Sequence, residues 1–306
     1  MKPSIPIKNY YFIQGIVLAL LGAVCFSTKA IFVKLAYRDT NIDALTLLAW
    51  RMIFSVPFFV GAALLSSGKT DNVKFTLKQW LYIAFIGCMG YYVSSFLDFL
   101  GLQFVTAGIE RLILFIYPTL VLLMSSFFFK EKIKPLQWAA VIVTYVGLAI
   151  AFFGEVDLHA PQNKNFLLGS FFIFVCAFTY AVYIVGSGRL IPKVGASKFN
   201  SYAMSFACAG VLLHFALLGD VSLLHLPIKV YTYSFFMAIF STVIPSYLVT
   251  ASIHRFGSGN VAIVGSVGPI STIILANIFL YEQITIWQII GTILILVGVW
   301  IIGKQN

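Results

Sequence analysis

Long apolar runs separated by short polar breaks dominate this chain. An apolar helix needs about 20 residues to cross the ~30 Å hydrocarbon core of a bilayer. Ten stretches approach that length, with expected ranges 12–36, 44–66, 79–101, 106–129, 135–153, 166–187, 199–219, 230–252, 258–280 and 285–302. The breaks are short and carry Gly, Asn, Asp, Lys or Pro. The pattern predicts an all-α integral membrane protein with ten transmembrane helices.

The second half of the chain repeats the first at a constant spacing of 151 residues. The aligned pairs are Gly108 and Gly259, Pro118 and Pro269, Phe128 and Phe279, Glu131 and Glu282, and Gly147 and Gly298. Chance does not align a mid-span proline, a turn glutamate and a packing glycine together, so we infer an internal duplication. The predicted repeats are 1–154 and 155–306, with five helices each. Because five is odd, the second repeat is inverted and both termini share a side.

Composition and charge support a membrane location and orient the chain. The sequence is 60% hydrophobic and 10% charged, whereas soluble domains are about 45–50% apolar and 25% charged. With the termini inside, thirteen Lys and Arg residues fall in inner segments and only Arg38, Lys164 and Lys229 in outer ones. This bias predicts cytoplasmic termini and an outer 154–165 loop. The net charge of +10 then belongs to loops beside anionic lipid and not to a nucleic-acid-binding surface.

Charged side chains also lie inside the predicted spans, where each costs about 2.5–3.5 kcal/mol and normally faces a partner or a cavity. These residues are Lys29, Arg51, Asp98, Glu110 and Arg111. A rise of 1.5 Å per residue places all five at similar depth in the outer half of the membrane. All five belong to the first repeat. The second-repeat counterparts of the last three are Val249, Val261 and Ala262.

The sequence leaves two interpretations of this charge cluster open. Asp98, Glu110 and Arg111 flank a tight helical hairpin and can form a structural network, while Lys29 can reach outward to the interface. Alternatively, because the five charges sum to +1, one cation lacks a partner and awaits an anion such as a substrate carboxylate or phosphate. In that case Lys29 and Arg51 contact the anion. Asp98 or Glu110 then holds a substrate amine or a coupling proton.

Uncharged polar residues recur on single faces of three predicted helices. The three sets are Tyr91, Ser94, Ser95 and Asp98; Thr179, Tyr183 and Ser187, with Tyr180 beside them; and Thr242, Ser246 and Thr250. Their spacing of three or four residues places each set on one face. Ser and Thr also hold membrane helices together, but three such faces beside buried charge favour a lined pathway. The predicted substrate contacts are the charged residues Lys29, Arg51, Asp98, Glu110 and Arg111, together with Tyr91, Ser94, Tyr180 and Tyr183.

Prolines and glycines mark two further features. Pro118 and Pro269 occupy equivalent mid-span positions, where each removes a backbone hydrogen bond, and we expect them to act as hinges of a gate. Glycines at sevenfold spacing, including Gly147 and Gly298, predict close-packing faces on the fifth and tenth spans, either internal or in a homodimer. The sequence contains no recognised metal-binding or catalytic motif, so we expect neither a metal, a cofactor nor an enzyme.

Several short motifs resemble the EamA-type repeat of the drug/metabolite transporter superfamily. They are Lys34-Leu35-Ala36, Ala49-Trp50-Arg51, Gly101-Leu102-Gln103, Thr106-Ala107-Gly108, Pro118, Phe129-Lys130-Glu131, Pro269, Tyr281-Glu282 and Gly298. The resemblance covers nearly the whole chain. It implies ten helices in two inverted five-helix repeats and a relation to exporters of amino acids and other metabolites. The family pattern does not supply Lys29, Asp98, Glu110 or Arg111, so these residues mark a subgroup and no substrate carries over.

These observations predict a secondary transporter of the bacterial inner membrane, with its site at the repeat interface. We expect it to export an amino acid or a related carboxylate-bearing compound by alternating access. One alternative is a metabolite–phosphate antiporter or an uptake system that uses the same cations. Another is a non-transporting sensor or assembly subunit in which the charges are structural. The expected partners are a small-molecule substrate, the lipid bilayer, a coupling proton and, in one alternative, a second copy of the chain.

Overall fold

The computed structural model describes residues 7–67, 75–129, 133, 135–155, 163–219, 225–265 and 267–303, and every regular element in these ranges is a helix. The first half contains α1 (Ile7–Thr40), α2 (Ala44–Ser67), α3 (Leu77–Gly87), the π-helical turn η1 (Cys88–Val93), α4 (Ser94–Gly101), α5 (Ala107–Leu114), α6 (Tyr117–Phe129) and α7 (Pro135–Glu155). The second half contains α8 (Asn163–Val194), α9 (Ala196–Leu218), α10 (Ile228–Ala238), the π-helical turn η3 (Ile239–Val243), α11 (Ile244–Phe256), α12 (Ser258–Val264), α13 (Val267–Leu280) and α14 (Ile286–Gly303).

Each predicted span coincides with one helix or with consecutive helices, which confirms the all-α membrane fold. Eight described spans are long and apolar enough to cross a bilayer. The apolar stretches of α7 and α14, Trp138–Ala151 and Ile286–Gly298, are shorter. Ten crossings therefore remain a prediction. Large apolar side chains such as Leu65, Phe127 and Leu217 are at least 72% exposed, as expected for surfaces that face lipid instead of water.

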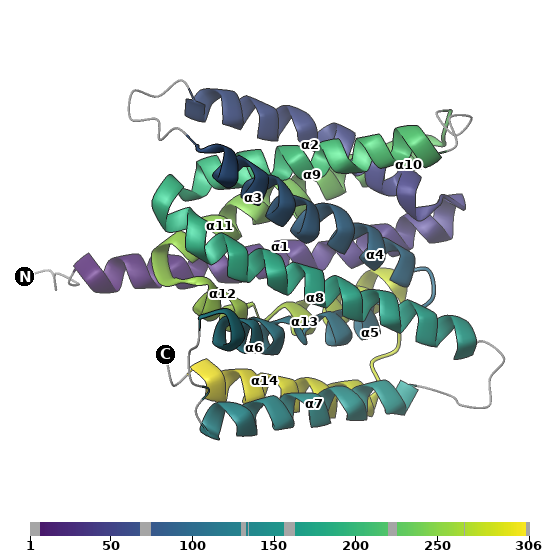
Figure 1. Ribbon diagram of the computed structural model, residues 1–306. Helices are drawn as coiled ribbons and strands as arrows, with labels where there is room; N and C mark the ends of the chain where they lie inside the picture. Colours follow the sequence, from purple (N-terminus) through teal and green to yellow (C-terminus); the bar gives the residue numbers. More distant parts are fainter. Residues whose placement is uncertain are drawn as a thin grey trace, which may run out of the picture.

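The two halves pack against each other in matched pairs (Figure 1). α2 contacts α9, and α7 contacts α14 along one edge of the molecule. α1 contacts α11 and α13, while its second-half counterpart α8 contacts α4 and α6. Exchanged pairs of this kind are the packing expected of two inverted repeats. The predicted repeat boundary after residue 154 falls at the end of α7, directly before the segment 156–162, which lies outside the described residues.

The glycine faces of α7 and α14 are used inside the chain. A Cβ added at Gly147 would stand 2.7 Å from the carbonyl oxygen of Gly291, and one added at Gly298 would stand 2.7 Å from that of Ala140. Only glycine permits so close a backbone approach. The internal alternative is therefore confirmed for these faces. Much of the Lys and Arg tally, including Lys130, Lys132 and Lys134, lies outside the described residues.

Equivalent irregularities interrupt the helices of both halves. The π-helical turns η1 and η3 begin at Cys88 and Ile239, which are 151 residues apart. Such turns widen a helix locally and occur frequently at functional sites. Pro118 is the second residue of α6 and Pro269 the third residue of α13. Each proline thus occupies the first turn of a new helix after a mid-span break, where a missing N–H costs little.

Candidate functional site

A cavity of about 70 Å³ lies between the two halves. The first half lines it with Ala19, Ala23, Phe26, Lys29, Arg51, Gly90, Tyr91, Ser94, Ser95, Arg111, Leu114 and Tyr117. The second half contributes Cys176, Tyr180, Ile184, Ser241, Val249, Val261 and Gly265. Six of the nine predicted substrate contacts are in these lists. The other three, Asp98, Glu110 and Tyr183, lie behind the lining and are fully buried.

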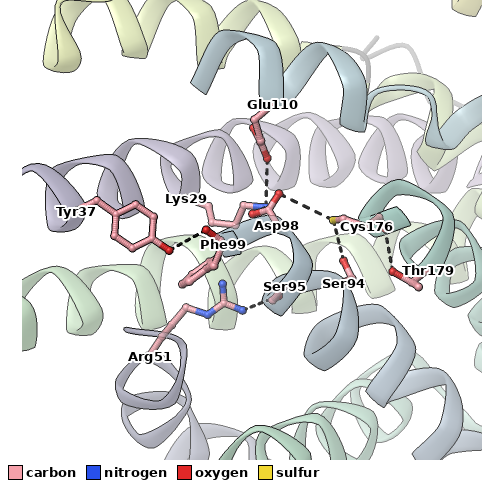
Figure 2. Close-up of polar contacts among 10 residues, drawn as sticks. All are labelled: Lys29, Tyr37, Arg51, Ser94, Ser95, Asp98, Phe99, Glu110, Cys176 and Thr179. Atoms are coloured by element: carbon pink, nitrogen blue, oxygen red, sulfur yellow. Dashed lines mark hydrogen bonds and ion pairs between the residues drawn. The ribbon is translucent and has the colours of Figure 1, made fainter. Parts of the chain in front are cut away.

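Lys29 on α1 connects the cavity to two buried carboxylates (Figure 2). Its Nζ lies 2.7 Å from Asp98 Oδ2 and 3.5 Å from Glu110 Oε1. The lysine side chain is 12% exposed, whereas both carboxylates are completely buried. Lys29 already has two anionic partners, so the geometry favours the structural interpretation for this residue. Its sequence-based role as a contact of the substrate anion stays a prediction.

Asp98 has a second neighbour on the far side of the ion pair. The Cys176 thiol on α8 lies 3.9 Å from Asp98 Oδ1, and the Ser94 hydroxyl lies 3.3 Å from the same sulfur. These contacts link α4 to α8, while the ion pair links α4 to α1. Asp98 thus lies where three helices meet and is held from two directions.

Arg51 on α2 contacts no carboxylate within 4.0 Å among the described residues. Its Nη2 donates to Ser95 Oγ at 3.0 Å, and its guanidinium lies 5.1 Å from the centre of the Phe99 ring. Nε and Nη1 are buried without a hydrogen-bond partner in this part of the chain. Because a guanidinium carries five N–H donors, Arg51 retains donors for an anion in the cavity.

Arg111 is a second cation without a carboxylate within 4.0 Å among the described residues. Its helix, α5, is positioned by contacts with the other half of the protein. Glu282 accepts hydrogen bonds from the backbone N–H groups of Ala107 (3.0 Å) and Gly108 (3.2 Å), and so caps α5. An acidic group at a helix N-terminus stabilises it. The Arg111 guanidinium lies so close to Gly268 on α13 that a side chain there would collide with it. Within the described residues, Arg111 Nε has no hydrogen-bond partner.

Aromatic rings form another wall of the cavity. The ring of Tyr180 lies 5.3 Å from that of Tyr117 and 5.9 Å from that of Tyr183, and Tyr183 lies 5.1 Å from Tyr91. Tyr117 also donates a hydrogen bond to the carbonyl oxygen of Ala262 across the two halves (3.2 Å). Ring pairs at these distances favour a fixed arrangement. The cavity therefore combines cationic donors with a rigid aromatic surface.

Two of the three polar faces predicted from sequence differ in role. The face on η1 and α4 enters the cavity through Tyr91, Ser94 and Ser95. By contrast, Ser246 accepts a hydrogen bond from Asn200 (3.0 Å) and Thr250 donates to the Ser246 carbonyl (2.8 Å), so the α11 face supports helix packing.

Two polar residues, Tyr117 and Ser241, are among the lining residues that sequence reasoning missed. Ser241 is the counterpart of Gly90 at the 151-residue spacing, and both line the cavity. The repeat spacing relates these two positions, but neither of them was predicted from the sequence. Tyr117 is a single aromatic residue before Pro118, and no periodic pattern marks it.

Comparison with known proteins gives consistent matches over the whole chain. The EamA-like transporter family model matches residues 13–153 and again 167–304. The chain is 30% identical over 283 residues to the uncharacterized transporter YcbK of Bacillus subtilis (strain 168), covering 90% of this chain and 88% of that protein. It is 21% identical over 290 residues to an uncharacterized transporter of Clostridium kluyveri, covering 93% and 91%. A crystal structure with 18% sequence identity aligns with a TM-score of 0.69 over 97% of this chain and 98% of that one, which indicates a shared fold.

Proposed function

Because the chain belongs to the EamA-like transporter family of the drug/metabolite transporter superfamily, we propose that it is a secondary transporter of a bacterial inner membrane and not an enzyme. It exports a small carboxylate-bearing metabolite, such as an amino acid, through alternating access to the cavity between its halves. Its termini lie in the cytoplasm and the 154–165 loop lies outside. Pro118 and Pro269 act as the hinges, and a coupling proton accompanies the cycle.

One observation carries the proposal: two guanidinium groups border the cavity without a carboxylate partner. Among the described residues, Arg51 and Arg111 have no acidic group within 4.0 Å, and both have unpartnered buried N–H groups. An unpaired cation inside a membrane protein is costly and typically serves an ion or substrate. The planar fork of arginine matches a carboxylate, often with two hydrogen bonds.

The remaining lining favours an apolar or flat body behind the anionic group. Tyr91, Tyr117 and Tyr180 border the cavity, together with Val249 and Val261. The volume of about 70 Å³ is below the ~300–1,000 Å³ typical of ligand pockets. The halves must therefore separate on one side to admit a metabolite, as alternating access requires.

A second candidate is a metabolite–phosphate antiporter. It is favoured by the pair of arginines, because a guanidinium fork matches phosphate as well as carboxylate. The two candidates differ in the substrate anion and not in the residues that contact it. One transport screen therefore distinguishes them.

The proposal is tested by reconstituting the purified protein into vesicles. The probes are a mixture of radiolabelled L-amino acids and small carboxylates and, separately, inorganic phosphate and sugar phosphates. We expect uptake of the first mixture, with Arg51→Gln and Arg111→Gln lowering the initial rate by about 10- to 100-fold, since a hydrogen bond to a charged group contributes about 1.5–3 kcal/mol. Arg38→Gln is the control because this arginine is 53% exposed and lies at the end of α1.

Three outcomes would count against this assignment. If the Arg38→Gln control lost as much of the initial rate as the cavity variants, the effect would come from general surface charge. Wild-type rates in both cavity variants would remove the arginines from the site. Uptake of phosphate compounds alone would replace the carboxylate exporter by the second candidate.

A further inference from the structure

We infer that Glu110 is a proton-binding site of the transport cycle, an inference that rests on the proposed transport function. Glu110 lies on α5, is 0% exposed and does not line the cavity. Neither carboxylate oxygen has a hydrogen-bond partner among the described residues. A buried carboxylate without donors is costly, whereas the protonated acid is not. The site therefore suits a carboxyl group that alternates between its two forms.

The neighbouring donors are already committed to other groups. Lys29 is the only described cation within 4.0 Å of Glu110, and it lies closer to Asp98, at 2.7 Å against 3.5 Å. The backbone N–H groups of the first turn of α5 are also occupied. Thr106 Oγ1 accepts from Ile109, and Glu282 accepts from the two residues before it. Of the two carboxyl groups that share Lys29, Glu110 is thus the one suited to hold the proton.

The surroundings of Glu110 define what its proton responds to. The ionisable groups around it are Lys29 on α1, Asp98 on α4, Arg111 on its own helix and Cys176 on α8. α13 packs on α5 but carries no ionisable side chain. α7, which also packs on α5, carries Tyr145, whose side chain is 37% exposed, and ends at Glu155.

The geometry couples the proton to an anion in the cavity. When an anion binds Arg51 and Arg111, it adds negative charge near Glu110, and like charge favours the protonated form. By reciprocity, protonation of Glu110 strengthens anion binding by the same factor. Proton and anion therefore travel together, and they leave the cell together when the outward gradient of the metabolite exceeds the inward gradient of protons.

Lys29 provides the route for the proton between Glu110 and the cavity, because it lines the cavity and also approaches Glu110. On release, its ammonium group gives one proton to water in the opened cavity and takes the proton of Glu110. The O–H bond of Glu110 breaks and its electron pair stays on the carboxylate oxygen. Lys29 ends with the charge it had, and one proton has moved from Glu110 to water.

The first test detects the proton directly and needs no substrate. Infrared spectra of the purified protein in lipid, recorded over a pH series, should show a carboxylic-acid carbonyl band that Glu110→Gln lacks. Glu110→Asp keeps an acid and should keep a band. Asp39→Asn is the matched control, because Asp39 is partly exposed and accepts hydrogen bonds from Arg38, Lys229 and Tyr233. Absence of the band in wild type, or its persistence in Glu110→Gln, would overturn the assignment.

The second test compares accumulation driven by a pH gradient with exchange at equal pH, using the radiolabelled amino-acid and carboxylate mixture. One-to-one coupling to a one-unit gradient supports about tenfold accumulation. In Glu110→Gln, we expect the substrate level reached with a pH gradient to be about equal to the level reached by exchange at equal pH, a ratio of about one. Exchange without any pH-driven accumulation in wild type would refute the proton site and the coupling proton, and it would leave the proposed transport of a carboxylate-bearing metabolite intact. Failure of every probe to move would refute the proposed function, and the infrared result alone would then decide whether Glu110 binds a proton.

Discussion

Helices α5 and α12 are counterparts in the duplication, yet they present different chemistry to the space between the halves. α5 carries Glu110 and Arg111, and the equivalent residues of α12 are Val261 and Ala262. Val261 lines the same cavity as Arg111. The neighbouring spans repeat this contrast, because Val249 on α11, the counterpart of Asp98, is also part of the lining.

This difference shows which features come from the duplication and which come from later substitutions. The duplication supplies the helical frame, and the substitutions supply the side-chain chemistry. The inverted repeats build a two-sided frame with matched helix pairs and matched π-helical turns. The side chains then make one wall ionic and the opposite wall apolar. Such walls would orient the ligand of the proposed function, with its charged group toward the first half and its apolar body toward the second. In the proposed cycle, both halves of the frame move while the ionic side chains stay in one half.

The largest expected effect follows removal of the central cation of the first half. Lys29→Met leaves Asp98 buried without its ion-pair partner at 2.7 Å. Loss of one member of a buried pair costs about 3–5 kcal/mol, so the thermal unfolding temperature in detergent should fall strongly. Adding Asp98→Asn should recover much of the loss. Additive effects of the two substitutions in a double-mutant cycle would show that the contact contributes nothing.

An intermediate effect on stability is expected when a carboxyl group is introduced at Val261, the second-half position equivalent to Glu110. Val261→Glu places a carboxyl group in a cavity lined by Arg51 and Arg111. Val261→Gln is the control because glutamine has nearly the same size and shape as glutamate but carries no charge. We expect the Glu variant to exceed the Gln variant in stability by about 1.5–3 kcal/mol, the worth of a hydrogen bond to a charged group, measured by thermal unfolding. Greater stability of the Gln variant would mean that the cavity does not attract anions.

The smallest effect on stability is expected at the paired prolines. Pro118 and Pro269 lie in the first turns of α6 and α13, so Pro→Ala there restores an N–H that the helix does not require. We expect the free energy of unfolding to change by less than about 1 kcal/mol, while the rate of transport into vesicles falls. A slower rate in one variant alone would show that the halves do not move equivalently. Full rates in both would leave the prolines as packing features.

The helical architecture was predictable because hydrophobic run length and the 151-residue spacing both report it. The breaks inside the fourth and ninth spans, after Leu114 and before Val267, were signalled only by nearby prolines. The π-helical turns were not predicted at all. One extra residue in a helical turn leaves the apolar pattern almost unchanged, so η1 and η3 carry no marker in composition.

The charge cluster was predictable as a cluster but not as a set of pairs. Depth along each span brought Lys29, Asp98 and Glu110 to one level, and the structure confirms that they meet. Depth does not tell which way a side chain points around its helix. The surplus cation expected from the charge sum was assigned to Lys29 or Arg51. The structure instead leaves Arg51 and Arg111 without acidic partners among the described residues.

The cap that Glu282 places on α5 also governs when the molecule can be completed during synthesis. The two hydrogen bonds join residues 175 and 174 positions apart. At ~5–20 residues per second, the ribosome needs about 9–35 s to reach Glu282 after making α5. The helix with Glu110 and Arg111 therefore receives its N-terminal cap only after most of the second half has been made. A nascent chain that stops before residue 282 therefore lacks both hydrogen bonds that cap the helix carrying Glu110 and Arg111.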